Sequence, residues 1–330
     1  MSYFCTIQIF LKLNKIQRNQ FMPFLMKDQL IKQLKSLKII PQKAEGQNYL
    51  IDFQICSTFV DDAQILSDQE DVLEIGPGLG AFSDLLAKRS RNFILIEKNT
   101  ESAKFLERHF QAHYATERIE SRQIKFLGSI SIKTKITIAE GNVLELPLPK
   151  VDVIIANLSF KISVEIFIHL IETWQYQRMF FILQKEFVDH LIATAGRAHY
   201  TFISVLVSFY FNVEIIRDLP ASAFYPKPRI NLKVVRFTPK AVLCPGKSEF
   251  DHRIEFIKFL KRVMIFKNKC VIKAVKGFLQ EREIQLVPEI DISQKLIKVN
   301  PDWNIQPLKN LSPSELYSLM EEIQTIRNLL

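Results

Sequence analysis

The chain has 330 residues, of which 48% are hydrophobic and 24% are charged, a composition typical of a folded globular protein. No apolar run reaches the roughly 18 residues that a membrane-spanning helix requires. The four cysteines are scattered without Cys-x-x-Cys spacing, so neither a zinc site nor a disulfide framework is indicated. We therefore expect a cytoplasmic protein with no metal and no membrane segment, and we take it to be a monomer.

The net charge of +9 predicts a polyanionic partner, and the excess is concentrated in two blocks. Residues 1–43 contain eight Lys or Arg against one acid, and residues 253–276 also contain eight against one. The alternative is that these side chains only keep helix faces solvated, since charge runs are common on protein surfaces.

The chain begins with a segment, residues 1–25, that we expect to be a disordered extension or the product of a start site assigned too early. Its Lys12, Lys15 and Arg18, together with its lack of acids, faintly resemble a targeting sequence. Met26 to Leu37 then has apolar residues on one face and lysines opposite, which predicts an amphipathic helix.

The most informative segment runs from Asp71 to Leu86. Val72 to Ile75 make a short apolar strand, and a helix begins soon after it. Between the two, Gly76, Gly78 and Gly80 allow the backbone to turn tightly beside a ligand. The segment therefore predicts a nucleotide-cofactor site.

A second apolar run, Phe93 to Ile96, ends in Glu97, whose carboxylate is placed to accept hydrogen bonds from two ribose hydroxyls. The glycine motif by itself leaves the cofactor open. With Ala81 in last place it fits the dinucleotide pattern as well as the closer glycine spacing of S-adenosylmethionine enzymes. Pro77 favours the second, because it has no N–H to offer a pyrophosphate.

Strands and helices then alternate as far as Pro239, which predicts a parallel sheet covered by helices on both faces. The polar stretch from Ala115 to Lys135 is expected to be a surface insertion. The two prolines of Phe224-Tyr-Pro-Lys-Pro228 should keep that loop out of the sheet. The other elements expected are strands at 136–139, 151–156, 179–183, 203–213 and 231–237, and helices at 100–111, 162–171 and 186–192.

Beyond Pro239 the pattern becomes helical, with helical apolar spacing at 250–266, 271–279 and 314–329. Ser312-Pro-Ser-Glu315 has the arrangement of a capping box at the start of the last helix. The sequence therefore predicts two domains, an α/β domain at residues 26–239 and an all-helical domain at residues 240–330.

Four segments occur in an order found in one known family: Gly46-Gln-Asn-Tyr-Leu-Ile-Asp52, Glu74 to Gly80, Asn157-Leu-Ser-Phe160 and Phe224 to Ile230. With them the chain resembles the ribosomal RNA adenine N6-dimethyltransferases, which modify two adjacent adenines near the 3′ end of small-subunit RNA. The archaeal branch is nearest, judging by Lys267 to Val271. The resemblance implies an S-adenosylmethionine-dependent, Rossmann-like methyltransferase fold with a seven-stranded sheet and a smaller helical domain that binds RNA.

The resemblance also implies the roles of individual residues. The side-chain oxygen of Asn157 and the backbone carbonyl of Leu158 would accept the two hydrogens of the adenine amino group, which makes its nitrogen pyramidal and nucleophilic. Phe160 and Phe224 would stack on the extruded base. The cofactor-binding residues implied are Gln47, Asn48, Leu50, Gly76, Gly78, Glu97, Asn142, Val143 and Asn157. In the second basic block, the residues expected to contact RNA phosphates are Lys258, Lys261, Arg262, Lys267, Lys269 and Lys273.

Four positions depart from the family's pattern. Ser159 and Phe160 replace the proline and tyrosine of the usual Asn-Leu-Pro-Tyr motif, Asn142 replaces an aspartate, and Asn231 stands where a serine is typical. Losing the proline frees a backbone dihedral beside the catalytic carbonyl, and losing the tyrosine hydroxyl keeps the stacking face. Asparagine can still accept a hydrogen bond through its oxygen.

Three functions remain open at this point. The preferred one is an active dimethylase of small-subunit ribosomal RNA, or of the immature small subunit, with a role in ribosome biogenesis. The altered residues raise the alternative of a catalytically weakened relative that binds nucleic acid as an assembly or transcription factor. Ala81 leaves open a nicotinamide-dependent oxidoreductase, although an enzyme that acts on small substrates does not need basic blocks.

Overall fold

The computed structural model describes residues 25–42, 47–66, 69–111, 115–120, 135–241, 249–280 and 289–328. Except for Leu25, the N-terminal extension expected at residues 1–25 lies outside this described part. No helix in the described part combines the length and the apolar character needed to cross a membrane.

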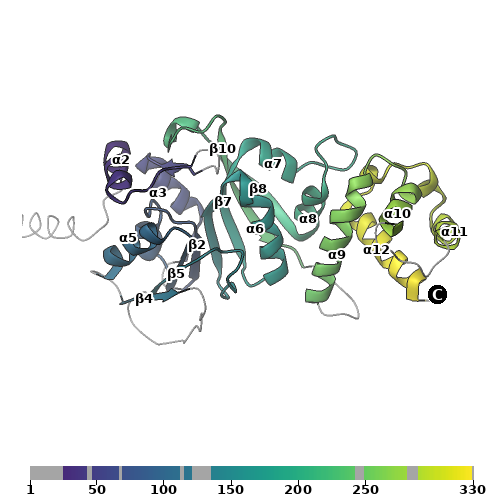
Figure 1. Ribbon diagram of the computed structural model, residues 1–330, viewed down its shortest axis with the longest axis horizontal. Coiled ribbons are helices and arrows are strands. Elements are labelled where there is room, and N and C mark those ends of the chain that lie inside the picture. Colours follow the sequence, from purple (N-terminus) through teal and green to yellow (C-terminus); the bar gives the residue numbers. More distant parts are fainter. Residues whose placement is uncertain are drawn as a thin grey trace, which may run out of the picture. The chain divides into compact units, whose positions relative to one another are not determined.

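One sheet of eight strands, in the order β4-β5-β3-β2-β6-β7-β10-β8, organises the fold (Figure 1). Neighbouring strands from β4 to β7 run parallel, as the alternation of strands and helices predicted. The α/β, Rossmann-like fold class is confirmed. The strands are β2 (Asp71–Ile75), β3 (Asn92–Glu97), β4 (Ala115–Glu120), β5 (Lys135–Glu140), β6 (Val153–Asn157), β7 (Arg178–Gln184), β8 (Phe211–Leu219) and β10 (Leu232–Pro239).

The sheet has one strand more than the seven expected, and β4 is a strand that the sequence did not predict. It lies within the stretch that was expected to be a surface insertion, and the structure corrects that expectation for Ala115–Glu120. An edge strand pairs through its backbone on one side only, so it needs few apolar side chains and leaves little pattern in the sequence. Residues 121–134 of the same stretch lie outside the described part.

Helices connect the strands and follow the last of them. The α-helices are α2 (Lys27–Ser36), α3 (Phe53–Asp62), α4 (Ser83–Ala87), α5 (Thr100–Gln111), α6 (Phe160–Thr173), α7 (Lys185–Leu191), α8 (Phe202–Tyr210), α9 (Glu249–Val263), α10 (Val271–Gln280), α11 (Glu289–Val299) and α12 (Pro313–Asn328). Short 3₁₀ helices are η2 (Ala221–Ala223), η3 (Met264–Phe266), η4 (Pro301–Asn304) and η5 (Leu308–Asn310). The helices expected at 100–111, 162–171 and 186–192 are confirmed in α5, α6 and α7.

The strand expected at residues 203–213 was wrong, because most of this segment is helix α8. The helix begins after Thr201, whose backbone N–H donates to Ser204 Oγ at 3.0 Å, and the chain turns to strand at Phe211. Ile203 to Val207 are all buried, so the helix shows a continuous buried run, apolar except for Ser204, instead of one apolar face. Such a run does not distinguish a buried helix from a buried strand.

The described chain divides into two compact units. The first comprises residues 1–161, 175–182 and 216–234, and the second comprises residues 162–174, 183–215 and 235–330. Helix α8 belongs with the C-terminal helices because Phe209 packs among them. Its ring centroid lies 5.0 Å from that of Phe256 on α9 and 5.1 Å from that of Tyr317 on α12. The domain boundary expected between residues 239 and 240 remains a prediction.

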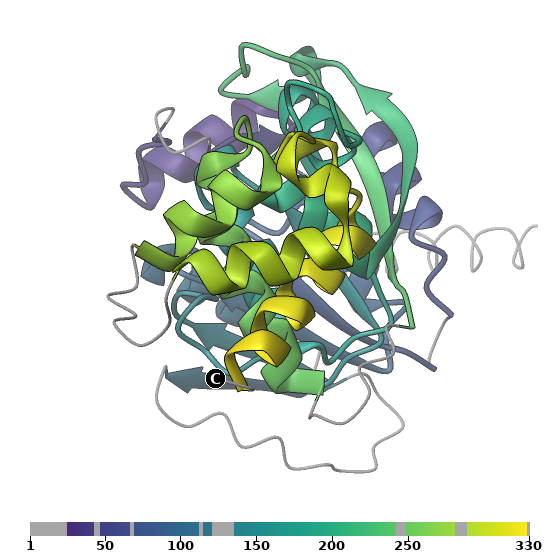
Figure 2. The same ribbon diagram turned by 90° about the vertical axis from the view of Figure 1, so that its right-hand side faces the viewer.

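The regular elements described after β10 are all helices, as expected, and Figure 2 shows them gathered together in green to yellow. The predicted capping box starts α12. Ser312 N–H donates to Glu315 Oε2 at 2.7 Å, and Glu315 N–H donates to Ser312 Oγ at 3.3 Å. Helix α11 was not predicted.

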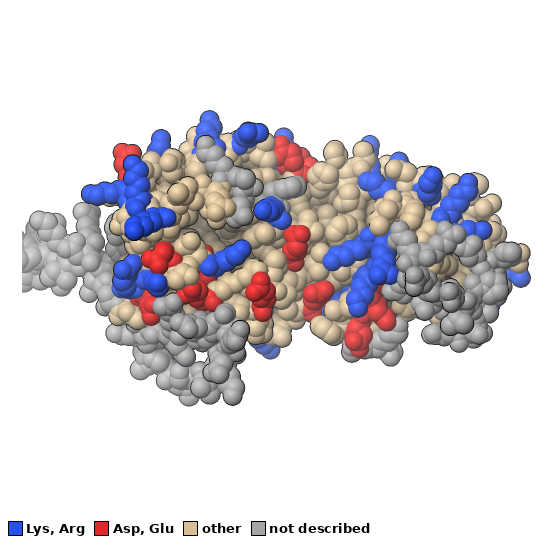
Figure 3. Space-filling model, in the orientation of Figure 1, with Lys and Arg blue, Asp and Glu red and all other residues tan. Residues whose placement is uncertain are grey.

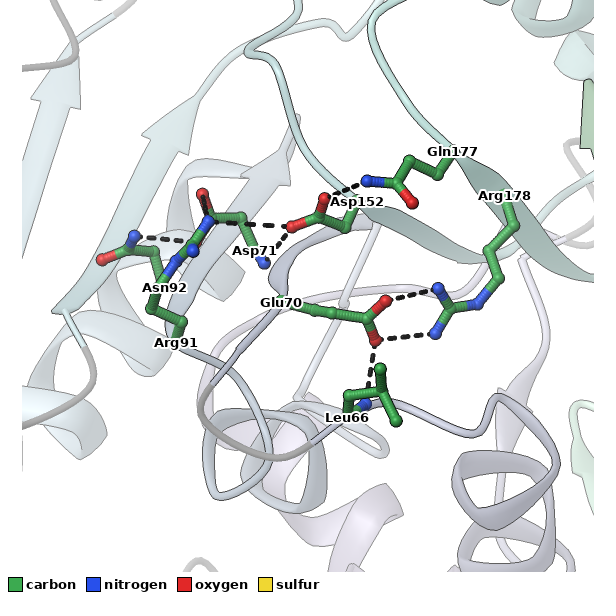
Figure 4. Close-up of polar contacts among 8 residues, drawn as sticks. All are labelled: Leu66, Glu70, Asp71, Arg91, Asn92, Asp152, Gln177 and Arg178. Atoms are coloured by element: carbon green, nitrogen blue, oxygen red, sulfur yellow. Dashed lines mark hydrogen bonds and ion pairs between the residues drawn. The ribbon is translucent and has the colours of Figure 1, made fainter.

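Charged and amide side chains tie together the amino-terminal ends of β2, β3, β6 and β7 (Figure 4). The guanidinium of Arg178, the first residue of β7, donates to Glu70, which also accepts the N–H of Leu66 at 2.8 Å. Beside this pair, Arg91 donates to both carboxylate oxygens of Asp71 at 2.9 Å. These contacts lie at the end of the strands opposite to the glycine loop.

Candidate active site

The glycine loop follows β2 and has the tight turn predicted from the sequence. Gly76, Gly78 and Gly80 have φ angles of +66°, +60° and +80°, a region that residues with a Cβ rarely adopt. Gly76 N–H donates to Ile96 O at 2.9 Å, which ties the loop to the end of β3. A Cβ built on Gly76 would meet no atom within 4 Å, so the loop borders open space. This is the room that a cofactor beside the glycines needs.

Glu97 ends β3 and holds the loop from the other side. Its Oε2 accepts the N–H of Gly78 at 2.8 Å, and its Oε1 accepts the N–H of Asn99 at 2.7 Å. Burial raises the pKa of Glu97, whereas the N–H groups of Asn99 and Gly78 oppose that rise. A backbone hydrogen bond from Lys98 also reaches this carboxyl group. Because a carboxylate has about four acceptor positions, it can still accept a ribose hydroxyl.

Two of the family-like segments pair as strands. β1 (Tyr49–Leu50) runs antiparallel to β9 (Phe224–Tyr225), with Leu50 opposite Phe224. The pair forms a separate two-stranded sheet, so the proline-containing loop stays out of the main sheet, as predicted. This pairing holds the segment that begins with Gln47 at a fixed position.

Asn157, the last residue of β6, reaches the same segment. Its Nδ2 donates to the backbone carbonyl of Asn48 at 2.9 Å. A carbonyl can only accept, so the NH₂ group must face Asn48 and the orientation of the amide is determined. The side-chain oxygen Oδ1 then remains as an acceptor. The N–H of Leu158 donates to Ile182 O at 3.1 Å, which fixes the backbone beside it.

Of the two phenylalanines expected to stack on a base, the structure describes the side chain of Phe224 only. Phe224 is 2% exposed and belongs to the main apolar core, as does Leu50 at 3%. Phe224 is thus buried in the protein without substrate, and its stacking role remains a prediction. Phe160 begins α6, and its side chain lies outside the described part of the structure.

Two other expected cofactor ligands use their side chains locally. Asn142 Oδ1 accepts the N–H of Leu144 at 3.2 Å, and its Nδ2 donates to Glu145 Oε1 at 2.9 Å. One lone pair of the Asn142 oxygen is left for an adenine amino group. Val143 is buried beside it. Gln47 Oε1 accepts the N–H of Gln42 at 3.1 Å, so its amide closes the preceding turn.

Sequence reasoning did not assign Glu74 or Tyr49, which both lie at the glycine loop. Glu74 Oε2 accepts the hydroxyl of Ser83 at 2.6 Å in a fully buried position. Burial raises the pKa of Glu74 to about 8, the Ser83 hydrogen bond opposes this, and the charge of Glu97 adds to it. The sequence signal that could have identified Glu74 is the presence of an acid within an otherwise apolar strand. The ring of Tyr49 lies against Gly78.

The six basic residues expected to contact RNA divide into two groups in the second unit. Lys267 is half-buried, and its Nζ donates to the carbonyls of Ala198 at 3.1 Å and Tyr200 at 2.9 Å, so it has a structural role that the sequence did not reveal. The exposed ones are Lys258, Lys261, Arg262, Lys269 and Lys273. Figure 3 shows Lys and Arg side chains over the visible face of the C-terminal helices.

No group of three or more His, Cys, Asp or Glu that could hold a metal ion occurs among the residues described. The residues around the glycine loop instead fit a nucleoside cofactor. Open space borders Gly76, and Glu97 retains acceptor capacity at the adjacent strand end.

Comparison with known proteins identifies the family. The family model described as ribosomal RNA adenine dimethylase matches residues 41–312. A probable ribosomal RNA small subunit methyltransferase A of Thermococcus sibiricus is 28% identical over 236 residues, which is 72% of this chain and 76% of that protein. A ribosomal RNA small subunit methyltransferase A of Mycoplasma mobile is 29% identical over 268 residues, 81% of this chain and 92% of that protein.

The fold is also found in solved structures. The crystal structure of a dimethyladenosine transferase from Plasmodium falciparum has a TM-score of 0.66 and 21% identity, and covers 84% of this chain and 97% of that one. The 23S rRNA methyltransferase ErmE has a TM-score of 0.52 and 16% identity over 84% of this chain and 99% of that one. The family model matches most of the length of this chain. The chain therefore belongs to the ribosomal RNA adenine dimethylase family, whose members are S-adenosylmethionine-dependent methyltransferases.

Proposed function

We propose that the protein dimethylates N6 of two adjacent adenines near the 3′ end of small-subunit ribosomal RNA, and that it does so as a cytoplasmic monomer during ribosome biogenesis. The orientation of Asn157 is the observation that carries this proposal. Its NH₂ group is held by the carbonyl of Asn48, which leaves Oδ1 as an acceptor at the end of β6. An acceptor there is what recognition of an amino group requires.

The lone pair of an adenine amino nitrogen is delocalised into the ring, which makes the nitrogen a poor nucleophile. Two acceptors aimed at its two hydrogens favour a pyramidal nitrogen with a localised lone pair. Asn157 Oδ1 and the backbone carbonyl of Leu158 are the two acceptors in our proposal. No base needs to remove a proton beforehand, because the N–H becomes acidic once the nitrogen carries the new methyl group. The residues therefore act by alignment.

When bound, S-adenosylmethionine would supply a methyl group on a sulfonium: the C–S bond would break towards sulfur as the N–C bond forms, and the proton then released from the nitrogen would pass to solvent. Gly76 and Gly78 would lie beside its methionine part and Glu97 would hold its ribose. Asn142 and Val143 would contact the adenine. The segment from Gln47 to Leu50 would cover it, supported by its pairing with β9.

The test is methyl transfer by the purified protein to small ribosomal subunits that lack the modification. We expect the parent protein to methylate adjacent adenines and Asn157→Ala to lose about 10²–10³-fold in rate, as for the loss of a positioned polar group at other active sites. Asn304→Ala, which removes an exposed asparagine from η4, is the matched control and should retain parental activity. Equal rates in parent and Asn157→Ala would refute the assigned role.

The same assay addresses the non-catalytic alternative raised by Ser159, Phe160 and Asn142. A parent protein that binds S-adenosylmethionine but methylates neither free RNA nor subunits would support a nucleic-acid-binding assembly or transcription factor. Family membership does not favour that alternative, and it leaves no place for the nicotinamide-dependent oxidoreductase.

A further inference from the structure

Tyr49 lies where three parts of the cofactor site meet. It is the first residue of β1, opposite Tyr225 of β9. The residue before it, Asn48, accepts the hydrogen bond from Asn157. Its ring carbon Cε1 lies 3.1 Å from the position of a Cβ built on Gly78, so the ring covers this glycine. Tyr49 therefore links the glycine loop to the residue that carries the proposed catalysis.

The hydroxyl of Tyr49 has no hydrogen-bond partner among the residues that the structure describes. A half-buried tyrosine usually directs its hydroxyl to a partner, since the ring is apolar and the oxygen is not. Burial, followed by the charge of Glu97, raises the pKa of Tyr49 to about 12. The hydroxyl thus keeps its proton at neutral pH and can donate a hydrogen bond to a ligand.

The surroundings of the hydroxyl select the ligand group. Gly78, which the Tyr49 ring covers, donates its N–H to Glu97, so the ring and the carboxyl group flank the same loop. A carboxyl group nearby disfavours an anionic ligand group such as the methionine carboxylate of the cofactor. A ribose hydroxyl fits, because it can donate to Glu97 and accept from a phenol at the same time.

We propose that Tyr49 is a positioning residue for S-adenosylmethionine. Its ring closes over Gly78, and its hydroxyl donates a hydrogen bond to a ribose hydroxyl, which in turn donates to the carboxyl group of Glu97. The inference rests on the proposed function, because it requires this cofactor in this site. It assigns to Tyr49 a hydrogen bond that phenylalanine at the same position would not make. Its effect reaches Asn157 through the carbonyl of Asn48, so the ribose and the catalytic amide are positioned by one segment.

The test is calorimetric binding of S-adenosylhomocysteine to the full-length parent, to Tyr49→Phe and to the matched control Tyr225→Phe. Tyr225→Phe removes a tyrosine hydroxyl from the strand paired with β1. We expect Tyr49→Phe to bind about 3–10-fold more weakly, the loss typical of one neutral hydrogen bond, and the control to bind as the parent does. The KM for S-adenosylmethionine should rise in Tyr49→Phe while kcat at saturation is retained.

Deoxyribose analogues of S-adenosylhomocysteine identify the ligand atom. For the analogue that lacks the hydroxyl bound by Tyr49, parent and Tyr49→Phe should bind equally, and for the other deoxy analogue the 3–10-fold difference should persist. The inference is overturned if Tyr49→Phe binds S-adenosylhomocysteine as tightly as the parent, or if the difference persists for both analogues. Failure of the parent itself to bind S-adenosylhomocysteine would instead refute the proposed function.

Discussion

Glu74 is a carboxyl group within the core of the first unit, at 1% exposure, where it accepts the hydroxyl of Ser83. Burial raises its pKa from 4.5 to about 8, against the Ser83 hydrogen bond and with an added contribution from Glu97. The folded state therefore holds this proton more tightly than the unfolded chain. The resulting contribution to stability is complete below about pH 4.5 and is lost as the pH rises through 8.

We expect Glu74→Gln, which cannot ionise but keeps an oxygen for Ser83, to lose this pH dependence. The melting temperature of the variant relative to the parent, measured without cofactor, should rise steadily between pH 5 and pH 8. Over this range the difference in the free energy of unfolding should change by an amount on the order of a few kcal/mol. Glu186→Gln removes an exposed carboxyl group from α7 and serves as the control, with a profile parallel to that of the parent. Parallel profiles for Glu74→Gln and parent would show that Glu74 does not titrate as described.

At the residue scale, the sequence predicted where polar and glycine residues lie in the site better than it predicted how exposed individual side chains are. The positive φ angles of the glycines and the placement of Glu97 and Asn157 at strand ends follow from residue type and strand pattern. The burial of Phe224 and the bonds of Lys267 to two carbonyls depend on tertiary packing, which adjacent residues do not encode. Many phenylalanines in one chain also make any single one an unreliable indicator of stacking.

Helix α8 shows the same limit at the scale of the element. Its predicted strand failed because Ser204 and the apolar residues around it are buried on all sides, so no periodicity of 3.6 survives. The signal that remained was Thr201 followed three residues later by Ser204, a pair placed to cap a helix. Edge strand β4 left even less pattern. Elements with one apolar face, such as α5, were predicted with their observed bounds.

Ser204 is therefore expected to contribute to the stability of this element. Its hydroxyl donates to His190 O at 2.6 Å, and its oxygen accepts the N–H of Thr201. Ser204→Ala leaves both backbone groups without that partner and should lower the free energy of unfolding by about 1–2 kcal/mol in urea titrations. Ser208→Ala changes an exposed serine of the same helix and should stay within about 0.5 kcal/mol of the parent. Equal effects of the two changes would contradict the capping role.

The ion pair between Arg178 and Glu70 joins β7 to the start of β2 (Figure 4). The hydrogen bond from Arg178 leads the contributions that lower the pKa of Glu70, while burial opposes them. A lowered pKa gives stability that is present at neutral pH and is lost as the pH falls below the range in which the unfolded carboxyl titrates. The pair should thus stabilise the sheet at neutral pH and weaken in acid.

We expect Arg178→Met to lower the free energy of unfolding at pH 7 by about 2–3 kcal/mol, because the Glu70 carboxylate would stay buried without its cation. The difference from the parent should shrink as the pH falls. Arg91→Met removes the guanidinium of a side chain that is 53% exposed and should cost less than about 1 kcal/mol. Denaturant titrations of all three proteins at pH 4 and pH 7 provide the measurement. A constant difference for Arg178→Met at both values would exclude the linkage to Glu70.

At the scale of the whole molecule, the net charge of +9 predicted a polyanionic partner before any residue was placed. The structure refines this, because a count of lysines and arginines does not separate Lys267, which donates to two backbone carbonyls, from side chains that face solvent. Lys261 and Arg262 end α9 in exposed positions, and they are adjacent in sequence. Both side chains are therefore accessible to RNA phosphates in the folded protein.

We expect the double variant Lys261→Ala/Arg262→Ala to bind small-subunit RNA more weakly and with a weaker dependence on salt. Removing one cation that neutralises a phosphate should reduce the slope of log K against log [KCl] by about 0.7–0.9, and removing two should reduce it by about 1.4–1.8. The control Lys104→Ala/Lys150→Ala removes the same charge from exposed positions of the first unit and should leave the slope close to that of the parent. The affinity for S-adenosylhomocysteine should be unchanged in both double variants. If both pairs lowered the slope equally, net charge would account for RNA binding, and α9 would have no specific part in it.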